Sequence, residues 1–162
     1  MRMALMIIDM QKAFYVGNSK TSMDSAVEYI NAAIEMFRTK NLPIIWVQDR
    51  GDVAPGEIGF ELIDQLKPQE NEHRIIKDYG NSFNKTECAK IIMDENIDTL
   101  IITGYCAEYC VLSTYRGALD LDIVPILFRG SIASGEKENI RFVESICDIA
   151  SYQVLRKLVK DT

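Results

Sequence analysis

Three residues of complementary chemistry stand at or just beyond the ends of apolar, strand-like runs. Asp9 ends the run 3–8, Lys77 ends a shorter run, and Cys110 follows the run 99–103. A carboxylate can take the proton of a thiol, a cation can stabilise the resulting thiolate, and the sulfur can attack a carbonyl carbon. The three residue types therefore predict an acyl-transfer site with a cysteine nucleophile, if the fold brings them together.

The position of Cys110 suggests how its sulfur is activated. The chain breaks at Gly104, and apolar residues then recur at helical spacing: Val111, Leu112, Tyr115, Ala118 and Leu119. Cys110 thus falls where a loop becomes a helix, facing unpaired backbone N–H groups and the positive end of the helix dipole. Such positions lower the pKa of a cysteine. We expect a thiolate at Cys110.

Histidine and cysteine usage narrows the chemistry. The chain has one histidine, His73, which begins a strand-like run instead of ending one. A cysteine–histidine pair and a multi-histidine metal site are therefore disfavoured, and we expect neither a metal nor a cofactor. The four cysteines are too few for a disulfide scaffold of this size. Cys106 and Cys110 leave a redox thiol pair open, although thioredoxin-type chemistry uses the closer Cys-x-x-Cys spacing.

Length and charge restrict the partners. The 162 residues have a net charge of −6 and carry lysine and arginine singly, so we expect no nucleic-acid partner. No apolar run reaches the length of a membrane span, and no charged leader precedes the first strand. We expect no membrane partner, a cytoplasmic location, a small-molecule substrate, and one domain covering residues 1–162.

Strand-like and helix-like segments alternate along the chain. In order, we expect strand 3–8, a helix from Thr21 or Ser22 to near Asn41, strand 43–47, a loop 51–72 with a short helix at 60–66, strand 73–77, helix 85–96, strand 99–103, a helix after Cys110, strand 123–128, helix 136–149 and a last short strand 152–155. Pro125 places strand 123–128 near an edge or a bulge.

This alternation predicts an α/β fold with a mainly parallel sheet and helices on both faces. The unbroken apolar run 3–8 supports it, because strands covered on both faces lack the alternation of half-exposed strands. Ligands bind such sheets beyond the carboxyl ends of the strands. Asp9, Lys77 and Cys110 can therefore meet there despite their separation in sequence.

Three separated motifs together resemble the isochorismatase-like cysteine hydrolase family, which includes nicotinamidases and N-carbamoylsarcosine amidases. They are Asp9-Met-Gln11 with Phe14, then Lys77 with Asn81, Ser82 and Phe83, then Gly104-(five residues)-Cys110-Val111-Leu-Ser-Thr114. The resemblance implies a three-layer Rossmann-like fold and an Asp9, Lys77, Cys110 catalytic triad. It also implies a cis peptide between Tyr105 and Cys106, and an oxyanion hole formed by the backbone N–H groups of Cys106 and Cys110.

The flanks of these motifs supply candidate pocket residues: Gln11, Phe14, Tyr15, Arg50, Phe83, Tyr105 and Tyr109. Nicotinamidases of the family begin a metal site with an Asp-x-His element, where this chain has Asp49-Arg-Gly51. Many members have Asp-Ala-x-Ala-Ser after the fifth strand, where this chain has Gly130-Ser-Ile-Ala-Ser134, a change for which the sequence offers no functional interpretation.

Hydrolysis of a C–N bond through a Cys110 thioester is the function that these motifs favour, with Asp9 as base. Three alternatives remain: vinyl ether hydrolysis of the isochorismatase type, a redox thiol pair, and a non-catalytic binding protein on the same fold. Seven tyrosines, six phenylalanines and one tryptophan are more aromatic surface than a small core hides, so we expect a homodimer or larger homo-oligomer.

Overall fold

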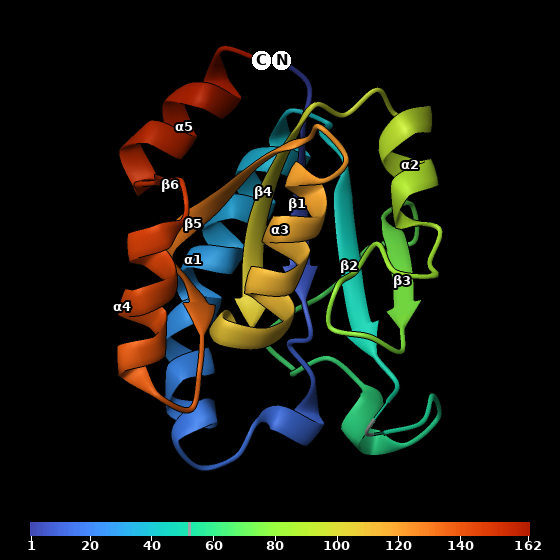
Figure 1. Cartoon of the computed structure of the whole chain (residues 1–162), viewed down its shortest axis with the longest axis vertical. Helices are drawn as coiled ribbons and strands as arrows, with labels where there is room; N and C mark the ends of the chain where they lie inside the picture. Colours follow the sequence, from blue (N-terminus) through green and yellow to red (C-terminus); the bar gives the residue numbers. More distant parts are fainter. Residues whose placement is uncertain (52) are drawn as a thin grey trace.

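The computed structural model describes residues 1–51 and 53–162, and its centre is a parallel β-sheet (Figure 1). In this described part the sheet has six strands in the order β3-β2-β1-β4-β5-β6, and every neighbouring pair is parallel. The strands are β1 (Met3–Ile8), β2 (Ile44–Asp49), β3 (His73–Lys77), β4 (Thr99–Tyr105), β5 (Val124–Ala133) and β6 (Ile149–Ala150). The predicted α/β class with a mainly parallel sheet is confirmed.

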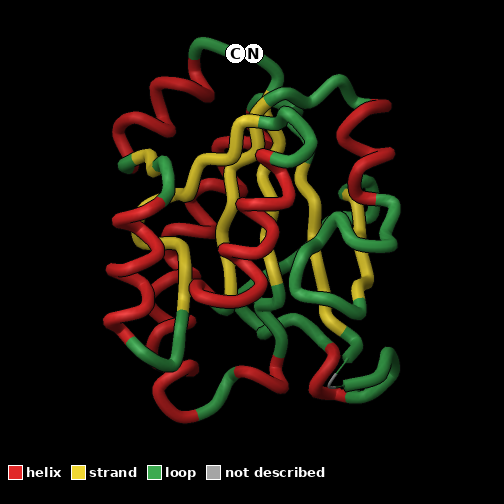
Figure 2. The backbone as a smooth tube through the Cα atoms, in the orientation of Figure 1, coloured by secondary structure: helices red, strands yellow, loops and turns green. Residues whose placement is uncertain are grey.

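Helices cover both faces of this sheet (Figure 2). The helices are α1 (Gly17–Thr39), α2 (Cys88–Asp94), α3 (Leu112–Leu119), α4 (Lys137–Ile146) and α5 (Tyr152–Lys160). Buried residues of α1 and α5 share one apolar cluster, and those of α2, α3 and α4 share another. No described helix is long and apolar enough to cross a membrane.

The packing of β1 on both faces explains why its sequence is apolar without interruption. Met3, Leu5 and Ile7 pack into the cluster with α1, whereas Ala4 and Met6 pack into the cluster with α3. All six residues of the strand are fully buried, because successive side chains point to opposite, equally covered faces. The central strand therefore holds Asp9 at a fixed point at the carboxyl edge of the sheet.

The predicted strand 152–155 is wrong, because these residues open helix α5. Ser151 caps the helix by accepting a hydrogen bond from the amide of Val154 at 3.4 Å. Leu155 and Val159, four apart, form its buried face. A short apolar run fits both a strand and a helix, and the strand in this region is the two-residue β6 just before it.

Other boundaries differ by a few residues from the prediction. Helix α1 starts at Gly17, before the expected Thr21 or Ser22, and the expected helix 60–66 is replaced by a 3-10 turn at Ile58–Phe60. The loop expected at 51–72 includes position 52, which lies outside the described residues. Strand β5 extends to Ala133. It is the second strand from the sheet edge, because only β6 lies beyond it, and its register with β4 shifts after Ile102.

Candidate active site

Four side chains meet at the carboxyl edge of the sheet, and each comes from a different strand end. Asp9 follows β1, Asp49 ends β2, Lys77 ends β3, and Cys110 follows β4. Strand β1 lies between β2 and β4, so the chain passes from one side of it to the other across the sheet. Ligand sites in such sheets form at this change of direction. The three residues predicted from the sequence do come together.

The ammonium group of Lys77 is the centre of this cluster. Its Nζ atom lies 2.8 Å from Asp9 Oδ2, 2.8 Å from Asp49 Oδ2 and 3.4 Å from Cys110 Sγ. The side chains of Lys77 and Asp9 are 0% and 1% exposed, and that of Asp49 is 15% exposed. A buried charge needs such partners, because it has lost the water that would otherwise solvate it.

Asp49 is a member of this cluster that the sequence motifs do not indicate. It stands where nicotinamidases of the family begin their metal motif, and here it lies opposite Lys77 in the β2–β3 register. Its second oxygen accepts a 2.7 Å hydrogen bond from the amide of Gly51, which fixes the carboxylate. The signal available in the sequence was its position, since Asp49, like Lys77, ends an apolar strand.

Burial and charge set the protonation states of Asp9 and Lys77. Burial raises the pKa of Asp9 to about 6, and the ammonium of Lys77 holds it from rising further. Burial also opposes the charge of Lys77, but the carboxylates of Asp9 and Asp49 outweigh it and raise the lysine pKa above its usual value. At neutral pH the site therefore holds a charged lysine and a base poised near its pKa.

The expected thiolate at Cys110 is wrong for the resting site. Burial first, and then the carboxylate of Asp9, raise the thiol pKa to about 12, and the opposing effect of Lys77 is too small to reverse this. Two carboxylates already face the single ammonium, so a thiolate would add a further negative charge to the cluster. Cys110 is thus a thiol at rest, and its activation needs a proton acceptor.

Asp9 is placed to be that acceptor. Its Oδ1 atom is the one buried side-chain oxygen or nitrogen among the described residues that has no hydrogen-bond partner. An Asp9 oxygen and Cys110 Sγ lie within 4.8 Å of each other. A buried carboxylate oxygen without a partner is energetically costly, so its position beside a thiol favours a role for it in the chemistry of the site.

The segment that carries Cys110 has an unusual backbone. Tyr105–Cys106 is a cis peptide, as the family resemblance implies, and residues Ala107–Val111 form a π-helix that leads into α3. Gly104 precedes it with φ of 114°, and a Cβ there would lie 2.1 Å from the carbonyl oxygen of Ile8. Only glycine lets β4 approach β1 this closely. The oxyanion-hole role of the Cys106 and Cys110 amides stays a prediction.

The candidate pocket residues separate into two groups. Gln11 is a positioning residue, because its amide bonds the main chain of Asp49 at 2.7 and 2.9 Å and that of Phe60 at 3.2 Å. The hydroxyl of Tyr15 bonds Asp24, and the guanidinium of Arg50 bonds the carboxylate of Asp78 at 2.8 and 2.9 Å. Tyr15 and Arg50 are thus engaged outside the four-residue cluster, whereas Gln11 holds the main chain of one of its members.

The second group consists of the other four aromatic candidates. Phe14 stacks on Tyr105 with ring centroids 5.3 Å apart, and the Tyr105 hydroxyl lies 3.0 Å from Ser19 Oγ. Phe83 is partly buried in the same apolar cluster as Cys110, and Tyr109 is 70% exposed. Their contact with a substrate stays a prediction.

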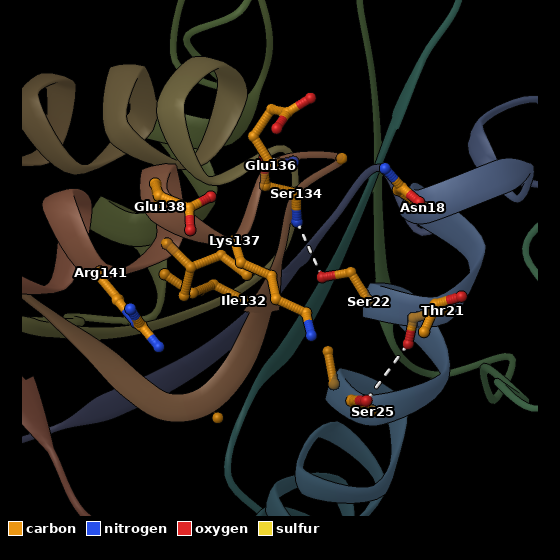
Figure 3. Close-up of a pocket in the computed structure, with 14 residues that line it drawn as sticks. Asn18, Thr21, Ser22, Ser25, Ile132, Ser134, Glu136, Lys137, Glu138 and Arg141 are labelled. Atoms are coloured by element: carbon orange, nitrogen blue, oxygen red, sulfur yellow. Dashed lines mark hydrogen bonds between the residues drawn. The ribbon is translucent and has the colours of Figure 1, made fainter.

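A cavity of about 610 Å³ lies near this site but is not lined by Asp9, Lys77 or Cys110 (Figure 3). It opens between the first turns of α1, the end of β5 and the first turns of α4. Ser134 is one of its lining residues, and its backbone amide donates a 3.1 Å hydrogen bond to Ser22 Oγ. Size alone does not make this cavity the reaction site, because the carboxylate, lysine and cysteine that meet at the strand ends do not line it.

The metal site of family nicotinamidases does not fit the residues present here. The side chain of Arg50 is bonded to Asp78, and Gly51 has no side chain to offer. Among the described residues, Asp9, Asp49 and Cys110 could in principle surround an ion, but the Lys77 ammonium already contacts all three. A lysine supplies the positive charge at this position.

Residues 3–143 match the isochorismatase domain family. The chain belongs to the isochorismatase family. It is 31% identical over 119 residues to the uncharacterized isochorismatase family protein YrdC of Bacillus subtilis. The aligned region covers 70% of this chain and 64% of YrdC. The expected family is thereby confirmed.

Two other relatives of this family member have more informative names. It is 24% identical over 165 residues to the ureidoacrylate amidohydrolase RutB of Klebsiella pneumoniae, covering 76% of this chain and 70% of RutB. The N-carbamoylsarcosine amidase structure from Thermoplasma acidophilum superposes with a TM-score of 0.83 at 23% identity, covering 93% of this chain and 96% of the amidase. That structural likeness shows the shared fold.

Proposed function

We propose that this isochorismatase family protein hydrolyses a C–N bond of a small amide, ureide or N-carbamoyl compound, with Cys110 as nucleophile. The observation that carries the proposal is the buried Lys77 ammonium, which contacts both the Asp9 carboxylate and the Cys110 sulfur. The names of the two relatives, an amidohydrolase and a carbamoyl amidase, support C–N hydrolysis over vinyl ether cleavage.

The first half of the reaction forms a thioester. Asp9 takes the proton of the Cys110 thiol as the sulfur attacks the carbonyl carbon, and Lys77 balances the negative charge in the cluster. The backbone N–H groups of Cys106 and Cys110 stabilise the oxyanion of the tetrahedral intermediate. Asp9 returns its proton to the leaving nitrogen as the C–N bond breaks, so the amine departs neutral.

The second half regenerates the enzyme. Asp9 takes a proton from water, the resulting hydroxide attacks the thioester carbonyl, and the C–S bond breaks. The proton returns to the sulfur, which restores the Cys110 thiol and the Asp9 carboxylate, and the carboxylic acid is released. Asp9 must take up a proton twice, first from the thiol and then from water, and a pKa of about 6 makes it a stronger base than an ordinary aspartate of pKa 3.8.

Asp49 has a supporting role in this mechanism. It bonds the Lys77 ammonium independently of Asp9, so the ammonium stays in place while Asp9 gains and loses its proton. When Asp9 is neutral, Asp49 still neutralises one charge on the buried lysine. The cluster therefore passes a proton without leaving Lys77 unpaired.

The redox alternative receives less support. Burial raises the pKa of the Cys106 thiol to about 12, and the adjacent carboxylate of Glu108 raises it as well. A redox-active pair requires a thiolate in at least one partner, whereas both Cys106 and Cys110 are held as thiols at neutral pH. Cys110 has the unpaired Asp9 carboxylate beside it, whereas the Cys106 thiol is bonded to Glu108. This difference fits one activated nucleophile and one structural thiol.

A screen of small primary amides, N-carbamoyl compounds and ureides tests the proposal. We expect turnover of at least one class, abolished in Cys110→Ala and retained in Cys147→Ala. Cys147 is a matched control because it is also a free, partly buried cysteine, at the end of α4. Undiminished turnover by Cys110→Ala would refute the proposed nucleophile.

A further inference from the structure

Glu108 is a charged residue that the mechanism does not use, two positions before Cys110. Its carboxylate accepts three hydrogen bonds from different parts of the fold: Cys106 Sγ at 3.0 Å, Ser134 Oγ at 3.0 Å and Asn139 Nδ2 at 2.8 Å. These donors belong to the cysteine segment, the end of β5 and helix α4. Glu108 thus joins three elements at one point.

The contact with Cys106 matters most, because both sides of that residue are held. Its carbonyl oxygen accepts hydrogen bonds from the amides of Tyr109 at 3.1 Å and Val111 at 3.2 Å. Its sulfur donates to Glu108 and lies 3.7 Å from Ser134 Oγ. With its carbonyl and side chain both bonded, Cys106 has little freedom to rotate about the bonds to its Cα, and this limits where its backbone N–H can point.

We propose that Glu108 is a positioning residue for the hydrolase, which acts by holding Cys106 so that its backbone N–H points at the developing oxyanion. This inference rests on the proposed function, since it assigns a task to the same site. Its structural basis is the three-way hydrogen bonding of one carboxylate, and its chemical basis is the steep dependence of oxyanion stabilisation on donor geometry.

The protonation states agree with this role. Burial opposes the charge of Glu108, but hydrogen bonds from Cys106, Asn139 and Ser134 among others outweigh it and hold its pKa below the usual range. The same contact raises the pKa of the Cys106 thiol. The carboxylate therefore stays charged and the thiol keeps its proton, which is the combination that the hydrogen bond needs.

Ser134 extends the network to the opposite face of the sheet. Its hydroxyl donates to Glu108 and accepts from the amide of Glu136 at 3.0 Å, while its backbone amide donates to Ser22 Oγ on α1 at 3.1 Å (Figure 3). The segment 130–134, which had no functional interpretation from sequence, thereby ties the first turns of α1 and α4 to the cysteine segment.

Glu108→Gln tests the inference, because it keeps the size of the side chain but turns an amide donor toward Cys106. With p-nitrophenyl acetate as acyl donor, we expect kcat to fall about 10-fold and KM to change less than about 3-fold. The matched control is Glu138→Gln on the first turn of α4, which removes the same charge. No side-chain hydrogen bond joins Glu138 to the described residues, so its kcat should be unchanged.

A second readout separates positioning from general damage. Alkylation of Cys110 by iodoacetamide needs deprotonation of the thiol but no oxyanion donor, so its rate in Glu108→Gln should equal that of the wild type or slightly exceed it. A parallel fall in kcat, alkylation rate and melting temperature would overturn the inference in favour of a purely structural role. An unchanged kcat would overturn it as well.

Two further variants keep the test decisive if Glu108→Gln does not fold. Asn139→Ala removes one donor to Glu108 but leaves the Cys106 contact, so it should lower kcat less than Cys106→Ala, which removes that contact. The reverse order would contradict the inference. Cys110→Ala, assayed alongside, separates the proposed function from the positioning role of Glu108. If Cys110→Ala is active, the proposed function is refuted. If Cys110→Ala is inactive but the Glu108 and Cys106 variants keep the wild-type kcat, the positioning role alone is refuted.

Discussion

Replacing Lys77 with methionine should strongly destabilise the fold. The substitution keeps an unbranched apolar stem but removes the ammonium that pairs with Asp9, whose side chain is 1% exposed. Leaving one member of a buried ion pair uncompensated costs about 3–5 kcal/mol of unfolding free energy. For a chain of this size, each kcal/mol lowers the melting temperature by about 2–4 °C, so we expect a decrease of about 6–20 °C.

The loss should depend on pH in a direction that the structure fixes. Lys77 lowers the pKa of Asp9, so its removal raises that pKa further above the value of about 6 in the wild type and the 3.8 of an unfolded chain. The native variant then binds the Asp9 proton more tightly than the unfolded chain does, and gains stability as the pH falls. The difference in unfolding free energy between wild type and variant should therefore be smaller at pH 5.5 than at pH 8.

Urea unfolding followed by circular dichroism at both pH values measures this. Lys12→Met is the matched control, because Lys12 makes a 2.7 Å ion pair with Glu61 on the surface, where solvent screens the charges. Its stability should change little at either pH. A loss in Lys77→Met below about 1 kcal/mol, or one that is equal at the two pH values, would refute the reasoning about the buried pair.

The remaining predictions concern pH, metal and assembly. The acidic limb of kcat/KM should have an apparent pKa near 6, because Asp9 must be deprotonated to act as base, and a limb near 4 would contradict this. Prolonged chelation should leave activity unchanged, since Lys77 already contacts the available ligands; activity lost with a stoichiometric metal would contradict it. Light scattering at micromolar concentration should give a dimer or larger assembly, and a monomeric mass would rule that out.

The sequence predicts the frame of the site well because strands and strand ends leave a strong local signal. The unbroken apolarity of β1 and the strand ends at Lys77 and before Gly104 were enough to bring Asp9, Lys77 and Cys110 together. The last helix was misread, since Tyr152–Leu155 is too short for its period to distinguish a helix from a strand.

The sequence predicts neither the protonation states of the site residues nor the contacts between residues far apart in the chain. A helix start predicts a low cysteine pKa, but the state of Cys110 depends on its burial and on Asp9, which is 101 positions earlier and contributes a nearby charge. The partnership of Asp49 with Lys77 and the contacts of Glu108 with Ser134 likewise arise from strand register and helix packing. A local pattern contains neither.

The most direct test of the central claim is to identify the sulfur that becomes acylated. We expect that p-nitrophenyl acetate, followed by acid quenching and peptide mass spectrometry, will give an acetyl thioester on Cys110 in the wild type and in Cys106→Ala. The adduct should be absent at this position in Cys110→Ala and greatly reduced in Asp9→Asn, where the proton acceptor is missing. Acetylation of Cys106 in the wild type, or turnover without any cysteine adduct in Cys110→Ala, would contradict the account.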